Sequence, residues 1–131
     1  MTRKFASSSV IVVISCVIVF HLMVIANVIP DDIVWGGRAR DRNTTMMLEL
    51  VSIIINIGIL AVTLIDAGML KIGFSRNTTR VIFVILFGLF ILNTIGNLFS
   101  ENKWEALIFT PMTLFLSVCC LRLASEKSNQ T

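Results

Sequence analysis

Charged residues are scarce in this sequence. Asp, Glu, Lys and Arg make up 15% of its 131 residues, while 56% are hydrophobic. A soluble domain carries about 25% charged residues, and its apolar fraction is lower. The mean hydropathy of +0.89 points the same way. This shortage of charge argues against a soluble globular domain and predicts a membrane protein.

Several short motifs are also missing. The three cysteines, Cys16, Cys119 and Cys120, all fall within apolar runs and none belongs to a C-x-x-C pair. That argues against a thiol-disulfide enzyme and against a structural zinc site. The Gly36-Gly37 pair is no phosphate-binding loop, and no nucleophile motif is present. One histidine with carboxylates from separate predicted helices has no metal-ligand spacing, so we predict neither a metal nor another cofactor.

Four apolar runs dominate what is present, at residues 10–29, 45–66, 81–99 and 106–124. A helix needs about 20 apolar residues to cross a hydrocarbon core roughly 30 Å thick. Continuous Ile, Val and Leu runs lack the alternation of a barrel strand, so the spans must be helices. The sequence therefore predicts one all-α domain over residues 1–131, an antiparallel bundle of four transmembrane helices in a lipid bilayer.

The positive charges indicate an orientation. Seven Lys and Arg residues lie on the N-terminus, the second loop and the C-terminal tail, against four on the first and third loops. The seven are Arg3, Lys4, Lys71, Arg76, Arg80, Arg122 and Lys127. The positive-inside rule then predicts that both termini are cytoplasmic. Because this placement accounts for the net charge of +3, we expect no nucleic-acid partner.

Polar residues inside the predicted spans follow helical spacing. The second span carries one stripe of them, at Glu49, Ser52, Asn56, Thr63 and Asp66. Polar side chains within a span usually face the bundle interior, so this stripe should face the other helices. The third and fourth spans add Asn93, Asn97, Thr110 and Thr113. We expect Glu49 to pair with Arg38 or another cation.

Most of these groups, with His21, fall in the half of the bundle away from the predicted cytoplasmic side, and the opposite half is mostly apolar. The first loop lies above them, and we expect Pro30 to end the first helix before it. Two interpretations stay open: hydrogen bonds between helices, or an outward-facing polar pocket. The candidate ligand-binding side chains are His21, Asp32, Trp35, Arg38, Glu49, Ser52, Asn56, Asn93, Asn97, Thr110 and Thr113.

The segment Pro30-Asp-Asp-Ile-Val-Trp-Gly-Gly-Arg38 is distinctive, together with the Glu49, Ser52 and Asn56 helix and the Asn93-Thr-Ile-Gly-Asn97 segment. This combination resembles small uncharacterised bacterial membrane proteins of four helices that carry a P-x-D-I-V-W-G-G-R loop after the first helix. The resemblance implies a bacterial cytoplasmic membrane. It implies no activity.

Three functions remain open at this point. The leading one is a small membrane protein that binds a lipid, a hydrophobic small molecule or a membrane partner, a second copy included, through the outer pocket. The first alternative is an intramembrane lipid-modifying or isomerase-like enzyme, with His21 and Glu49 as acid and base. The second is a small dimeric proton-coupled transporter that uses Glu49 or Asp66.

Overall fold

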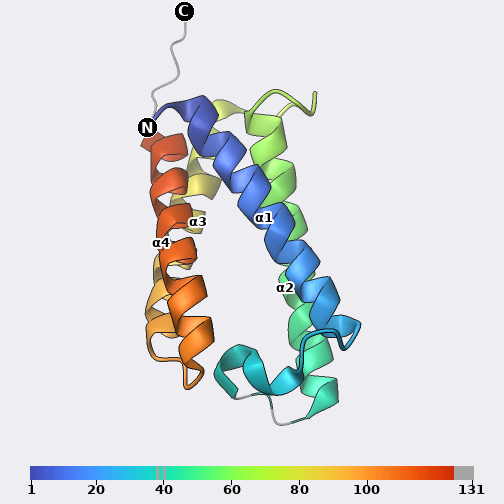
Figure 1. Cartoon of the computed structure of the whole chain (residues 1–131). Helices are drawn as coiled ribbons and strands as arrows, with labels where there is room; N and C mark the ends of the chain where they lie inside the picture. Colours follow the sequence, from blue (N-terminus) through green and yellow to red (C-terminus); the bar gives the residue numbers. More distant parts are fainter. Residues whose placement is uncertain (38, 40, 126–131) are drawn as a thin grey trace, which may run out of the picture.

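The chain is all-helical in the computed structural model, which describes residues 1–37, 39 and 41–125 (Figure 1). The helices are α1 (Arg3–Ile25), α2 (Arg42–Asp66), α3 (Arg76–Leu98) and α4 (Lys103–Ser125), and two short 3-10 turns, η1 (Asp31–Ile33) and η2 (Trp35–Gly37), lie between α1 and α2. All four helices are long and apolar enough to cross a membrane. The predicted fold class is confirmed, and the chain is a small integral membrane protein.

Each helix begins several residues before the apolar run that predicted it, because a polar residue caps its first turn. The Thr2 and Ser75 hydroxyls each accept the backbone N–H three residues later, both at 3.2 Å. The Asp41 carboxylate accepts the N–H of Thr44 at 3.4 Å. Asn102 Oδ1 accepts two N–H groups at the start of α4. Such caps satisfy backbone donors that a helix leaves open, so the helices extend beyond the hydrocarbon-length runs.

The end of α1 differs from the sequence prediction. The helix stops at Ile25, not at residue 29 before Pro30. Asn27 adopts a left-handed conformation, with φ of 59°, which asparagine tolerates at a helix end. The Arg42 guanidinium then donates to the carbonyls of Val24 and Ile25, at 3.2 and 2.6 Å. A local cap, and not the proline, ends this helix.

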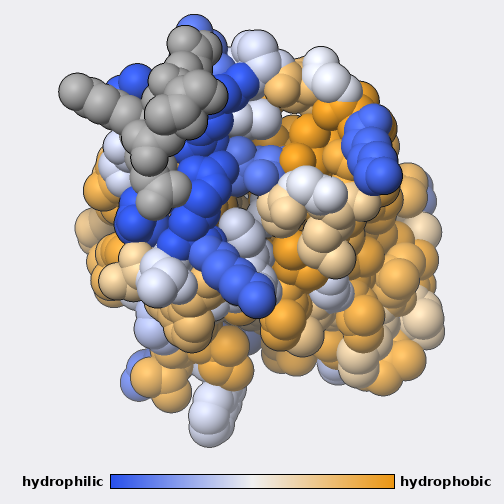
Figure 2. Space-filling model, turned by 90° about the horizontal axis from the view of Figure 1, so that it is seen from above, coloured by the Kyte–Doolittle hydropathy of each residue, from blue (hydrophilic) through white to orange (hydrophobic). Residues whose placement is uncertain are grey.

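Two hairpins, α1–α2 and α3–α4, form the bundle, and they meet mainly where α1 packs on α4, while α2 and α3 touch little. The packing of α3 on α4 is the most extensive, as their short connection predicts. Figure 1 shows both termini and the α2–α3 connection at one end of the bundle, which we call the termini end. The α1–α2 and α3–α4 connections lie at the opposite end, which we call the loop end. In the view onto the termini end, hydrophilic residues gather over part of this end and hydrophobic residues cover the flanks of the bundle (Figure 2).

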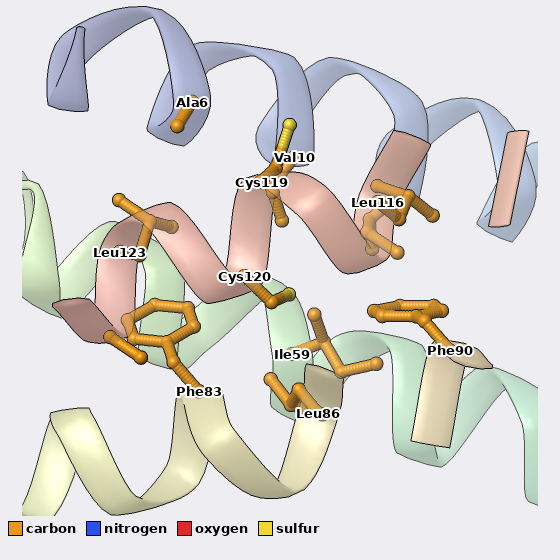
Figure 3. Packing of buried hydrophobic residues seen from close by; sticks show 12 residues of the cluster. Ala6, Val10, Ile59, Phe83, Leu86, Phe90, Leu116, Cys119, Cys120 and Leu123 are labelled. Atoms are coloured by element: carbon orange, nitrogen blue, oxygen red, sulfur yellow. The ribbon is translucent and has the colours of Figure 1, made fainter. Parts of the chain in front are cut away.

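The buried apolar core lies in the half of the bundle nearer the termini end. Figure 3 shows side chains from all four helices meeting around Cys119 and Cys120 of α4, which pack there as small apolar groups. Phe83, Leu116 and Leu123 are the large side chains that fill the space beside them. No comparable cluster occupies the loop-end half of the described residues. The packing therefore leaves room between the hairpins toward that end.

Candidate functional site

A cavity of about 420 Å³ lies between the two hairpins, toward the loop end of the bundle. All four helices and the first connection line it. Its wall is mostly apolar, with Phe20 of α1, Ile55 of α2, Phe90 of α3 and Phe109 of α4 among the larger groups. Small-molecule sites in proteins span about 300–1,000 Å³ and combine an apolar wall with a few polar groups. The cavity has the size and the wall composition of such a site.

Eight of the eleven predicted site residues line the cavity: His21, Trp35, Glu49, Ser52, Asn56, Asn93, Asn97 and Thr113. Asp32 is exposed and does not line it. Thr110 does not line it either, and its buried hydroxyl oxygen has no hydrogen-bond partner in the part of the chain that the structure describes. Arg38 lies outside the described residues. Glu105 lines the cavity and was missed by the sequence analysis.

Glu49 organises the polar part of the wall. Its side chain is 1% exposed, and its two oxygens accept from different partners: Trp35 Nε1–H donates to Oε1 at 2.7 Å, and His21 Nδ1 lies 2.6 Å from Oε2. A carboxylate can only accept, so the His21 proton on this side sits on Nδ1. A neutral imidazole then keeps its lone pair on Nε2, and among the described residues Nε2 has no partner. The partners of Glu49 are thus an imidazole and an indole.

The first connection closes the loop end of the cavity by binding both hairpins. Trp35 binds α2 through Glu49, and the N–H of Gly36 donates to Glu105 Oε2 of α4 at 2.6 Å. The Ser100 hydroxyl donates to the same oxygen at 2.6 Å. Glu105 was missed because its partner is a backbone amide far away in the sequence, which no residue pattern marks. Residues 30–37 therefore bridge the two hairpins, and we call them the bridging loop.

The bridging loop holds a strained backbone at its contact points. Trp35 has φ of 57° and Gly36 has φ of 66°. Gly36 adopts this conformation without steric cost, because glycine has no Cβ. For a bulky residue such as Trp35 the left-handed region is an outlier that costs about 1–2 kcal/mol. Such strain persists where surrounding contacts hold it and is common at functional sites, and here the Glu49 hydrogen bond holds the indole.

The open side of the cavity lies between α2 and α3. Of the lining residues, Val51, Ile55 and Asn93 are exposed, and all three belong to these two helices. On the opposite side Phe20 of α1 packs edge-on against Phe109 of α4, with ring centroids 5.1 Å apart. The cavity therefore opens sideways between spanning helices, toward the surroundings of the bundle.

Some of the predicted polar groups bind each other across helices. Thr94 and Thr113 are hydrogen-bonded between α3 and α4 at 2.9 Å, and Asn97 Nδ2 donates to Thr113 Oγ1 at 3.5 Å. Asn56 Nδ2 donates to the Ser52 carbonyl of its own helix at 2.8 Å. Asn93 has no side-chain partner among the described residues. The polar set thus combines interhelical hydrogen bonds with groups that face the cavity.

A second ionic cluster, at the termini end, was also missed. Asp66, with a side chain 3% exposed, pairs with Arg3 of α1 and with Arg76 of α3, whose Nη1 lies 2.8 Å from Oδ1. Arg76 and Arg3 also donate to the Leu123 carbonyl of α4, at 2.7 and 3.3 Å. The cluster joins all four helices and forms no part of the cavity wall.

The part of the chain that the structure describes brings no three His, Cys, Asp or Glu side chains together as a metal site would require. Comparisons with family models, with curated proteins and with solved structures found nothing that matches this chain. The cavity and its polar wall are therefore the basis for inferring a function.

Proposed function

We propose that this membrane protein binds a lipid or another hydrophobic small molecule in the cavity between its hairpins. The observation that carries the proposal is the cavity itself, about 420 Å³, with an apolar wall and a polar region at one end. An amphiphile has the same division, since its chain matches the apolar wall and its head group matches the polar region.

The position of the open side supports a ligand that comes from the bilayer. The exposed lining residues lie within α2 and α3, so a molecule in the hydrocarbon reaches the cavity without crossing the bridging loop. Asn93 stands at this opening as an exposed amide within an apolar helix. A polar side chain facing hydrocarbon is unfavourable, and a ligand group that hydrogen-bonds to it relieves that cost.

The test is photolabelling in nanodiscs with a diazirine-bearing hexadecanol, followed by mapping of the labelled peptides. We expect labelling of cavity residues on α2 and α3. Ile55→Trp fills the opening and should abolish this labelling. Ile54→Trp is the matched control, because Ile54 is 70% exposed and does not line the cavity. Equal labelling of both variants at cavity residues, or labelling confined to the outer surface, would overturn the proposal.

A second candidate is an intramembrane isomerase, and the contact between His21 and Glu49 favours it. The ring is oriented by the carboxylate, with Nε2 unpaired among the described residues at the cavity wall. An imidazole held this way can act as a general base. In such a reaction Nε2 removes a proton from a carbon next to a double bond and returns it at the far end of the shifted double bond.

Solvent exchange tests this second candidate. A base that removes carbon-bound protons exchanges them with solvent, so the protein incubated with membrane lipid extract in heavy water should introduce deuterium into an unsaturated lipid. Mass spectrometry detects this gain, which His21→Gln should abolish. If the wild-type protein introduces no deuterium into any extracted lipid, the isomerase is excluded and the binding function stands alone.

A further inference from the structure

We infer that the ligand of this cavity carries a protonated amine, so that the site selects an ammonium-bearing amphiphile over a neutral or anionic one. The inference rests on the proposed binding function and specifies its ligand. Two observations support it: the charge of the cavity wall, and the hydrogen-bonding groups of the wall that have no partner among the described residues.

The ionisable groups of the wall are predominantly acidic. Among the described lining residues they are Glu49, Glu105 and His21, and no lysine or arginine is among them. The His21 ring is bound by Glu49 through Nδ1. A cationic head group is attracted by this wall, whereas an anionic one is repelled, and both effects strengthen in a low dielectric.

Several acceptors of the wall have no partner among the described residues, and some amide and hydroxyl donors remain there as well. The indole N–H of Trp35 is used by Glu49, and Asn56 and Asn97 each donate one amide hydrogen to a protein oxygen. Their carbonyl oxygens have no partner among the described residues. Glu105 accepts both its hydrogen bonds on Oε2, so its Oε1 is also unpaired there. An ammonium group supplies three donors and no acceptor, which complements this set.

An alcohol supplies one donor and no charge, and a carboxylate supplies neither donor nor positive charge. Hydrogen bonds to charged groups contribute about two to three times as much as neutral ones. We therefore expect the cavity to prefer an alkylammonium to an alcohol of equal chain length by about tenfold or more. The aromatic rings of Trp35 and Phe109 in the wall add a favourable environment for a cation.

The experiment is competition against the diazirine-bearing hexadecanol by dodecylamine, dodecanol and dodecanoate, in nanodiscs of one neutral lipid. We expect dodecylamine to compete at a concentration about tenfold lower than dodecanol, with dodecanoate weakest. Glu105→Gln should remove most of this preference. Glu101→Gln is the matched control, since Glu101 is exposed, lies near the same loop end and does not line the cavity.

A second variant covers the case in which Glu105→Gln fails to fold. Asn56→Leu keeps the number and branching of the side-chain heavy atoms but removes an acceptor from the wall, and it should weaken dodecylamine competition more than dodecanol competition. Equal competition by the three amphiphiles, or preference for dodecanoate, overturns the ammonium inference and leaves the binding function in place. Absence of specific labelling by the hexadecanol probe instead overturns the binding function.

The ammonium can belong to a bilayer phospholipid or to a free amphiphile. Lipid extraction from protein purified out of mixed vesicles of phosphatidylethanolamine, phosphatidylcholine and phosphatidylglycerol separates these sources. Enrichment of phosphatidylethanolamine, lost in Glu105→Gln, identifies a lipid head group. Competition by dodecylamine without such enrichment identifies a free amine. Enrichment of phosphatidylglycerol contradicts the inference.

Discussion

The two ends of the bundle each bury a carboxylate, but they bury it differently. Asp66 at the termini end lies between two guanidinium groups and belongs to a cluster that joins all four helices. Glu49 at the loop end lies between an imidazole and an indole and forms one wall of a cavity. The first arrangement is closed by its own partners. The second leaves polar groups available, so we propose the ligand at the loop end, whereas the contacts at the termini end hold the four helices together.

Removing the charge of Asp66 should have the largest effect. Asp66→Asn removes the buried carboxylate charge that both Arg3 and Arg76 bind, and breaking such an ion pair costs about 3 kcal/mol. The free energy of unfolding in bicelles measures this loss. Asp32→Asn is the control, because Asp32 is exposed and should change stability by no more than about 0.5 kcal/mol. If the two variants lose equal stability, the termini-end cluster does not hold the bundle together.

Trp35→Phe should have the next largest effect, at the loop end. It removes one donor from the buried Glu49 carboxylate, and an unpaired buried acceptor costs about 2 kcal/mol. The other tryptophan provides the control, since Trp104 is 73% exposed and Trp104→Phe should be nearly neutral. The same unfolding measurement compares them. A Trp35→Phe variant as stable as Trp104→Phe would show that the indole bond to Glu49 is unimportant.

The two left-handed glycines, one near each end, sharpen the comparison. Gly36 and Gly68 have φ of 66° and 74°, so an alanine at either position should cost about 1 kcal/mol. Only Gly36→Ala disturbs the bridging loop, whereas a Cβ at Gly68 meets open space. In a Trp104→Phe background, Trp35 fluorescence should shift for Gly36→Ala and stay constant for Gly68→Ala. A shift in both would mean that the two ends are not independent.

The smallest effect should come from the hydrogen bond between Thr94 and Thr113. A double-mutant cycle with valine at both positions should give a coupling of about 0.6 kcal/mol, as for other interhelical hydrogen bonds in membranes. The corresponding cycle of Arg3→Met with Asp66→Asn should give a larger coupling. If the threonine pair couples as strongly as the ion pair, the difference between the two ends is smaller than the contacts indicate.

The sequence predicted the helices well, because the thickness of the hydrocarbon core fixes the length of an apolar run. The polar stripe of α2 has buried side chains at Glu49, Thr63 and Asp66, as its spacing predicts. It predicted the helix starts poorly, because capping by residues such as Ser75 depends on polar segments outside the runs. It also predicted that the half of the bundle nearer the termini is mostly apolar, whereas the Asp66 cluster lies in that half. Asp66 pairs with guanidinium groups of two other helices, and the sequence does not show that they converge.

The candidate site was only partly predictable for a related reason. Periodicity placed His21 and Glu49 at a similar depth, but their contact depends on how α1 packs against α2. Glu105 could not be found, because its role depends on the left-handed turn that aims the Gly36 amide at it. Asp31 pairs with Arg42 at 2.6 Å, a contact that no spacing in the sequence marks. The cytoplasmic position of the termini and the bacterial membrane stay predictions.

The limited contact between α2 and α3 has a mechanical consequence. The hairpins are fixed to each other at the termini end by the Arg3, Asp66 and Arg76 cluster, and at the loop end by the contacts of the bridging loop. Releasing the bridging loop from the second hairpin, by breaking the Gly36–Glu105 and Ile33–Asn102 hydrogen bonds, would allow the hairpins to rotate about this cluster. A small rotation there moves the far ends of 23-residue helices by several ångströms. The separation of the hairpins at the loop end therefore depends on these two hydrogen bonds and on the contact of Phe20 with Phe109.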